Sequence, residues 1–142
     1  MNNLAMGSHE SNTPWDYYET MGGGMGASRL IDGLTGVQSH MTNTLNTPIE
    51  SLESHYPVRV LEYAIRSGSG ITRELLFLEP AQVTMLTERR SRGPWGLEGG
   101  ASGLPGQQSL DGKVLPAKFT TQVESGQRLR IETPGGGGFG SK

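Results

Sequence analysis

The sequence predicts a mainly β protein, or an α+β protein with little helix, built as an antiparallel sheet or sandwich with long glycine-rich loops. Short runs rich in β-branched residues occupy the second half of the chain, which is typical of strands. The 142 residues include 22 Gly and 8 Pro, roughly twice the ordinary combined usage of about 12%. No stretch of residues 1–48 keeps a helical apolar period for more than two turns, and we expect at most one short helix in the whole chain.

The clearest predicted strand is Val58–Ile65, which Pro57 and the run Ser67–Gly70 bound. Four more runs of strand-like composition follow: Ile71–Leu78, Gln82–Glu88, Ala117–Glu124 and Gln127–Thr133. Ser125-Gly126 between the last two predicts a tight hairpin. We expect an irregular loop over Ser91–Gly112, where glycine and proline are dense.

Residues 1–48 are rich in Asn, Thr, Ser and Gly, and we expect them to be irregular. A short helix is predicted to begin near Pro48 and to end by Pro57, with Thr47 as its N-cap. These patterns predict one domain over 1–142, with a loop-rich pocket segment over 1–56 and a β-rich segment over 57–142.

Charge and cysteine usage exclude several classes of protein. The chain has 12 Lys+Arg and 14 Asp+Glu, a net charge of −2, whereas nucleic-acid-binding domains usually carry a basic stripe. No apolar run approaches the length of about 20 residues that spans a bilayer. The absence of cysteine excludes disulfides, Cys-ligated zinc and a thiol nucleophile, and it fits a cytoplasmic protein.

Two polar segments are candidates for chemistry. Tyr17-Tyr18-Glu19 places a carboxylate beside two phenols, which suits acid–base work, although the rings could equally be buried. The segment His40–Thr47 is dense in side chains able to orient an amide or carboxylate. The alternative is an Asn/Thr loop whose side chains satisfy their own backbone.

The glycine runs and the histidines give weaker signals. Backbone amides in Gly22–Gly26 could cradle an oxyanion, but the spacing matches neither a P-loop nor a dinucleotide fingerprint, so loop geometry is the simpler interpretation. His9, His40 and His55 form no metal-ligand pair with each other or with a carboxylate. We therefore expect no metal in this chain.

Taken in order, the motifs resemble the C-terminal part of the hydantoinase B family, and the match spans nearly the whole chain. That family includes the B-type subunit of ATP-dependent N-methylhydantoinase and the matching half of 5-oxoprolinase. The resemblance is carried by Tyr17–Thr20, Gly22–Ala27, His40–Thr44, Asn46–Glu50, Glu88–Arg90, Pro94–Leu97, Gly99-Gly100 and Glu132–Gly140.

The resemblance implies a hydrolase that uses ATP to phosphorylate the carbonyl oxygen of a cyclic amide such as hydantoin or 5-oxoproline, so that water can open the ring. A hydantoinase A-type subunit is expected to bind ATP and Mg, and this chain to bind no cofactor. Since the family's B-type subunits are several times longer, we expect a C-terminal fragment that is inactive alone. Any metal ligands of the family are expected in the N-terminal part of a B-type subunit.

The family pattern also suggests roles for individual residues. Tyr18, Glu19 and His40 are candidate catalytic groups, of which Glu19 or His40 would handle protons. The candidate substrate-binding residues are Asn43, Thr44 and Asn46, with Gly23, Gly24 and Gly26 as backbone donors to an oxyanion. Expected partners are the A-type subunit, the N-terminal part of a B-type subunit and a possible second copy. The alternative function is a non-catalytic β-rich binding module that keeps the family fold.

Overall fold

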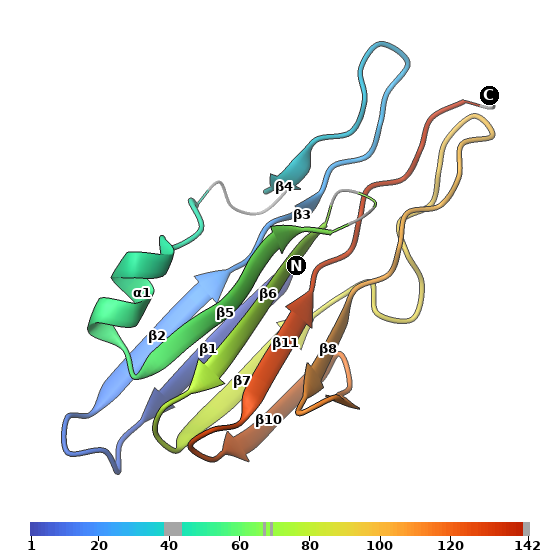
Figure 1. The fold of residues 1–142 in the computed structure, drawn as a ribbon. Helices are drawn as coiled ribbons and strands as arrows, with labels where there is room; N and C mark the ends of the chain where they lie inside the picture. The colour runs from blue at the N-terminus through green and yellow to red at the C-terminus, as the bar shows by residue number, and fades with distance from the viewer. Residues whose placement is uncertain (39–43, 67, 69, 141–142) are drawn as a thin grey trace.

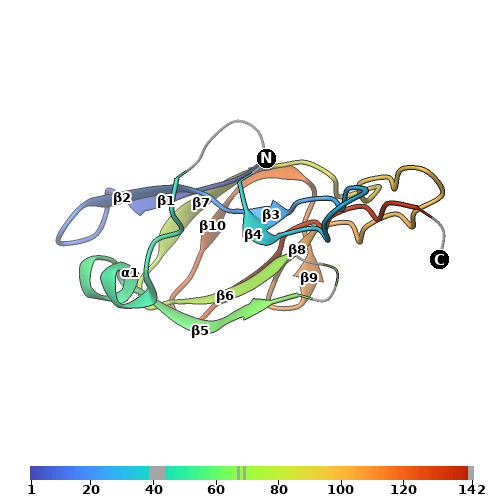
Figure 2. The same cartoon turned by 90° about the horizontal axis from the view of Figure 1, so that it is seen from above.

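The protein forms two antiparallel sheets that face each other across one core (Figures 1 and 2). The computed structural model describes residues 1–38, 44–66, 68 and 70–140. The first sheet has the order β10-β7-β1-β2, with bounds Lys118–Val123, Ala81–Thr87, Asn2–Ser8 and Trp15–Thr20. The second has the order β5-β6-β11-β8-β9, with bounds Val58–Ile65, Ile71–Phe77, Arg128–Glu132, Gln107–Leu110 and Lys113–Val114. The predicted fold class is confirmed.

Alternation of buried and exposed residues explains how the sheets stack. In β7, Ala81, Val83 and Met85 are buried, while Gln82 and Leu86 between them are exposed. Successive side chains of a strand point to opposite faces, so each sheet turns one apolar face inward. The core between the sheets includes Leu4, Met6, Trp15, Tyr17, Val58, Leu75, Phe77, Val83, Met85, Val123, Leu129 and Ile131.

All five of the predicted strands are confirmed to within one residue at each end, as β5, β6, β7, β10 and β11. The expectation that 1–48 is irregular is wrong, because β1 and β2 pair with each other and β1 also pairs with β7. In β1 only Leu4 and Met6 carry large apolar side chains into the core. Pairing on both sides overrides the weak strand propensity of Asn and Gly there. The expected loop 91–112 also contains β8.

The predicted hairpin at Ser125-Gly126 is wrong in its pairing. The turn itself forms, and the Gln127 amide donates to the Glu124 carbonyl at 3.2 Å. However, β10 pairs with β7 in the first sheet, and β11 pairs with β6 and β8 in the second. The turn therefore crosses between sheets. A hairpin within one sheet and a turn between two sheets would both bury Val123 and Leu129. The pattern of apolar residues therefore does not distinguish the two connections.

The predicted helix is confirmed as α1, Ile49–His55, which buries Leu52. The prediction that Thr47 caps it is wrong: no side chain makes a capping hydrogen bond, and Pro48 occupies the N-cap position. The Thr47 hydroxyl is instead hydrogen bonded to Tyr17. Among the described residues, no helix is long and apolar enough to cross a membrane.

Three loop segments extend together from one end of the sandwich, and we call them the glycine arm: 22–37, 91–106 and 133–140 (Figure 1). The arm includes the short pair β3 (Gly23–Gly24) and β4 (Thr35–Val37). The C-terminal segment runs between the other two. Its carbonyl groups accept the amides of Ala27 on one side and Leu97 on the other, at 2.8 and 2.9 Å.

Backbone rather than side chains fills the interior of the glycine arm. A Cβ built on Gly136 would lie 2.3 Å from the Met25 carbonyl oxygen, and one on Gly137 would lie 2.0 Å from the Trp95 carbonyl oxygen. Consecutive glycines thus press against two different segments. No other residue fits at either position without moving backbone.

We predict that Gly137→Ala disrupts the glycine arm, because the new methyl group would overlap the Trp95 carbonyl. Overpacking of this kind costs about 1–3 kcal/mol. Amide hydrogen exchange at Ala27, Leu97 and Gly138 should accelerate, while exchange in β1 and β7 should stay unchanged.

The control is Gly26→Ala, whose Cβ would lie 3.2 Å from its nearest neighbour, the Gly137 carbonyl oxygen. It should perturb exchange much less. Equal protection of the arm amides in Gly137→Ala and the unsubstituted chain would contradict the backbone-packing explanation.

Candidate functional site

A buried ion pair joins the two sheets. Glu19 of β2 and Arg73 of β6 face each other across the core, and the Arg73 Nη1 donates to Glu19 Oε2. Their exposed fractions are only 5% and 1%. The pair exists because each residue takes an inward position in its own strand, next to Leu4 and Ile131 in the pairing registers. The Arg73 guanidinium also lies 4.6 Å from the centroid of the Tyr63 ring.

The ion pair holds Thr47 through its backbone amide and carbonyl groups, and Tyr17 holds its side chain. The Thr47 amide donates to Glu19 Oε1 at 2.8 Å, and the Arg73 Nη2 donates to the Thr47 carbonyl at 3.2 Å. The Thr47 hydroxyl lies 2.9 Å from the Tyr17 hydroxyl. The segment that enters α1 is therefore fixed to both sheets at one residue.

Tyr17 completes this cluster. Its hydroxyl donates to Glu19 Oε2 at 2.9 Å, and its ring meets the Tyr56 ring edge-on, with centroids 5.0 Å apart. Burial raises the pKa of Tyr17 to about 12, and the neighbouring Glu19 charge adds to the shift. The hydrogen bond with Thr47 and the charge of Arg73 act in the opposite direction. Tyr17 is thus held as a neutral phenol over the ordinary pH range.

Asn46 lies next to this cluster and carries an unpaired acceptor. Its Oδ1 is shielded from solvent and accepts no hydrogen bond from the described residues. A buried acceptor without a partner costs about 1–3 kcal/mol. Such an atom is suited to receive a donor from a ligand. Among the described residues, no group of three or more His, Asp or Glu side chains could hold a metal ion.

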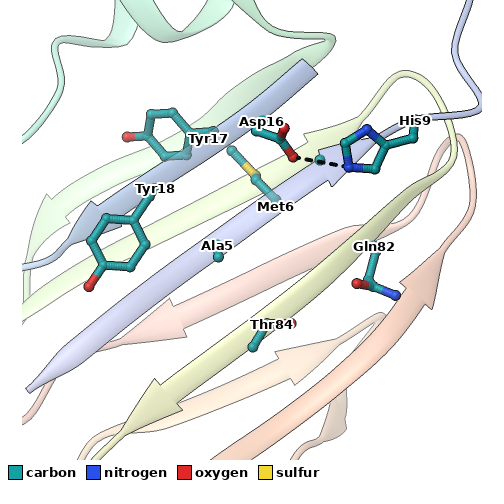
Figure 3. Close-up of a pocket in the computed structure, with 9 residues that line it drawn as sticks. Ala5, Met6, His9, Asp16, Tyr17, Tyr18, Gln82 and Thr84 are labelled. Atoms are coloured by element: carbon teal, nitrogen blue, oxygen red, sulfur yellow. Dashed lines mark ion pairs between the residues drawn. The ribbon is translucent and has the colours of Figure 1, made fainter. Parts of the chain in front are cut away.

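Tyr18 lies on the opposite face of the same strand. It is 64% exposed and borders a shallow hollow of about 350 Å³ on the outer face of the first sheet. Figure 3 shows Ala5 on the floor of this hollow, with Gln82 and Thr84 along one side and the His9–Asp16 ion pair at one end. The small side chain of Ala5, with Gly7 beyond it, leaves the space open.

Arg90 makes a second polar link between the sheets, at the base of the glycine arm. Its Nη1 donates to Asn2 Oδ1 of β1 at 2.9 Å, and its Nε donates to Gln108 Oε1 of β8 at 2.5 Å. Burial lowers the pKa of Arg90 to about 10, and the nearby Arg66 charge contributes. The arm is thus anchored to the sandwich by a cation with neutral partners.

Comparison with known proteins identifies the family. The family model for hydantoinase B/oxoprolinase matches residues 1–142. The chain belongs to the hydantoinase B/oxoprolinase family. This confirms the resemblance that the motifs indicated.

Relatives of this family member are much longer than the chain. It is 44% identical to 5-oxoprolinase 1 of Arabidopsis thaliana, matching 99% of this chain and 12% of that protein. It is 31% identical to the B-type subunit of a putative D-/L-hydantoinase of a Pseudomonas species, matching 97% of this chain and 26% of that relative. The ATP-dependent caprolactamase of Pseudomonas jessenii shares the fold, with a TM-score of 0.74 and 23% sequence identity. The match covers 98% of this chain and 28% of the caprolactamase chain.

The structure separates the predicted catalytic residues of this hydantoinase B-type chain. Glu19 points into the core and Tyr18 points to the outer surface, so the two do not share a site. His40 and Asn43 lie outside the described residues. Thr44 is exposed, whereas Asn46 lies beside the Thr47 cluster.

The predicted backbone donors lie in the glycine arm. The Gly24 amide donates to the Pro134 carbonyl at 3.0 Å, so the fold itself uses this group. Gly23 pairs with Val37, and Gly26 lies against Gly137. The role of these amides toward an oxyanion stays a prediction.

Sequence reasoning missed Arg73 and Thr47 as members of the buried cluster. Arg73 lies in Ile71–Phe77, at a position whose neighbours two residues away on either side, Ile71 and Leu75, are apolar and buried. An arginine at an inward position of a strand needs a buried partner. A charged residue at an inward strand position was therefore the signal that could have revealed the pair. Glu19, at an inward position of β2, shows the same signal for the opposite charge.

We predict that Arg73→Met lowers the free energy of unfolding by about 3–5 kcal/mol, because it leaves Glu19 buried without its cation. Urea denaturation checks this. The double variant Glu19→Gln/Arg73→Met should lose less than the sum of the two single variants.

The control is Arg130→Met on the outer face of the second sheet, where Arg130 contacts Glu62 and Glu74 at a partly exposed position. That change should cost about 1 kcal/mol or less. Losses of equal size at Arg73 and Arg130 would show that the buried pair has no special weight.

The raised pKa of Tyr17 predicts a pH dependence. The unfolded phenol, with a pKa near 10, ionises first, so the folded state binds more protons between pH 10 and 12. The stability that Tyr17 contributes is therefore complete below pH 10 and is lost as the pH rises toward 12. Tyr17→Phe should flatten this decline, and it should remove the part of the 295 nm absorbance change that occurs near pH 12. An unchanged absorbance titration would contradict the assignment.

Proposed function

We propose that this chain contributes to an ATP-dependent enzyme that opens a cyclic amide, and that it forms part of the hydrolytic site rather than the nucleotide site. Membership of the hydantoinase B/oxoprolinase family supports this proposal. So do the names of its relatives, a 5-oxoprolinase and a hydantoinase B-type subunit, and of its structural neighbour, an ATP-dependent caprolactamase. ATP and Mg would be bound by an A-type partner subunit in the cytoplasm.

The observation that carries the site is the unpaired Oδ1 of Asn46 beside the fixed residue Thr47. The N–H group of a lactam or imide ring is a donor of the kind that this oxygen lacks. The Glu19–Arg73 pair holds Thr47 in place, so the acceptor is positioned before substrate binds. Positioning of this kind removes part of the entropic cost of reaction.

In this proposal Glu19 positions Thr47, and Asn46 binds the N–H group of the substrate ring. Glu19 already accepts hydrogen bonds from Arg73, Tyr17 and the Thr47 amide. Proton transfer to the ring falls to His40, with Asn43 and Thr44 as further substrate contacts. The chain alone would be inactive, because it spans 26% of a B-type subunit.

The test measures ATP turnover and ring opening of 5-oxoproline, N-methylhydantoin and caprolactam. This chain is assayed alone, with an A-type subunit, and with an A-type subunit plus the rest of a B-type chain. We expect activity only in mixtures. Silence in every mixture of folded components would overturn the catalytic proposal.

In an active mixture, Asn46→Ala should lower kcat/KM by about 10–100-fold, the size expected for one lost hydrogen bond to substrate. Its stability should stay equal or rise, because the change removes an unpaired buried acceptor. Ser51→Ala on the exposed face of α1 is the matched control and should change neither. Loss of stability together with activity would assign Asn46 a structural role instead.

A second candidate function is a β-rich binding module without catalysis. The separation of Tyr18 from Glu19 on opposite faces of β2 favours it. In that case the mixtures would show no ring opening, while the chain would still bind its partner subunits.

A further inference from the structure

The glycine arm exposes several large apolar side chains, beside the exposed charged residues Arg29, Asp32, Arg92 and Glu98. Its interior is backbone, packed so closely that a Cβ on Gly137 would overlap a neighbouring carbonyl. Most of its large apolar side chains are exposed, whereas Met25, Val37 and Phe139 are partly buried. The exposed ones are Leu30, Ile31, Leu34, Trp95, Leu97 and Leu104.

The two hairpin-like segments of the glycine arm each present part of this surface. Leu30 is 90% exposed at a tight turn in which the Ser28 amide donates to the Ile31 carbonyl at 2.9 Å. Trp95 is 63% exposed on the other segment. Figures 1 and 2 show both segments extending away from the sandwich, so the core does not cover either.

Trp95 packs against Arg89, which is itself exposed. The Arg89 guanidinium lies 4.5 Å from the centroid of its ring, which covers one face of the indole and leaves the side chain largely exposed. A tryptophan that already contacts a neighbour loses less conformational entropy when a partner packs on it than one without such a contact. Tryptophan and arginine are also the residues most enriched among the strong contacts of protein interfaces.

We propose that the glycine arm is the docking element through which this chain binds the rest of a hydantoinase B-type chain, which packs an apolar surface on Trp95, Leu97 and the Leu30–Ile31 turn. The relatives supply the argument for this occupant. The same unit is 28% of the caprolactamase chain and 26% of the hydantoinase B-type subunit. Nearly three quarters of each of those chains is thus available to cover the arm. This inference rests on the proposed function for its choice of partner.

The test uses this chain as it stands. It is produced alone and together with a tagged version of the remaining part of the Pseudomonas hydantoinase B-type subunit, and hydroxyl-radical labelling is read by mass spectrometry. We expect the tagged part to copurify with the chain. Trp95, Leu97 and Leu30 should then be labelled at least about tenfold more slowly than in the chain alone, while Leu78 and Val114 on the sandwich should be unchanged.

Variants measure the contribution of the surface. Trp95→Ser and Leu30→Ser should each weaken binding of the tagged part by about tenfold or more. Leu78→Ser, at an exposed leucine beside β6, is the matched control and should leave binding unchanged. Equal binding by all three variants would overturn the assignment to the arm.

The remaining outcomes are also decisive. A tagged part that is soluble but does not copurify, or one that stays insoluble beside the chain, overturns the proposal. Concentration-dependent protection of Trp95 in the isolated chain overturns it in favour of a second copy. Because binding is read without any assay of ring opening, failure of the docking proposal and failure of the catalytic proposal are distinguishable.

Discussion

The buried pair of Glu19 and Arg73 is the constraint on which the candidate site depends. Each charge removed from water carries a penalty of several kcal/mol, which only a close partner and further hydrogen bonds can offset. Here the two charges come from opposite sheets, so they are satisfied only when the sheets stack in one register. The pair therefore contributes specificity of assembly, and the apolar core around it contributes the greater part of the stability.

The same pair also fixes the position of the segment that precedes α1 relative to the two sheets. The Thr47 amide donates to Glu19, and its carbonyl and hydroxyl oxygens accept from Arg73 and Tyr17, so a residue in a connection is held by both sheets. Asn46 is the neighbour of Thr47 in the chain, and its Oδ1 accepts no hydrogen bond from the part of the chain that the structure describes. Binding sites commonly hold a side chain rigidly while leaving one of its hydrogen-bonding atoms available for a ligand.

The glycine arm is packed in a different way from the sandwich. The sandwich buries side chains between two sheets, whereas the arm buries backbone between three segments. Glycine permits the close approach, and amide-to-carbonyl bonds such as that from Leu97 to Gly138 replace the missing apolar contacts. The result is an ordered extension that exposes several large apolar side chains beside charged ones, which fits a surface that another chain covers.

The sequence by itself determined the fold class, α1, most strands of the second half and the family, because these depend on local patterns and on motifs that are contiguous in the chain. It did not determine that β1 and β2 form strands, or that the turn at Ser125-Gly126 crosses between sheets. Local patterns record which residues are buried but not what they are buried against. The partnership of Glu19 with Arg73, the separation of Tyr18 from Glu19, and the fixing of Thr47 were decided only by the tertiary structure. The physical reason is that the contacts among Glu19, Arg73 and Thr47 join residues 26 to 54 positions apart, whose distance is set by the stacking of the sheets and not by the spacing along the chain.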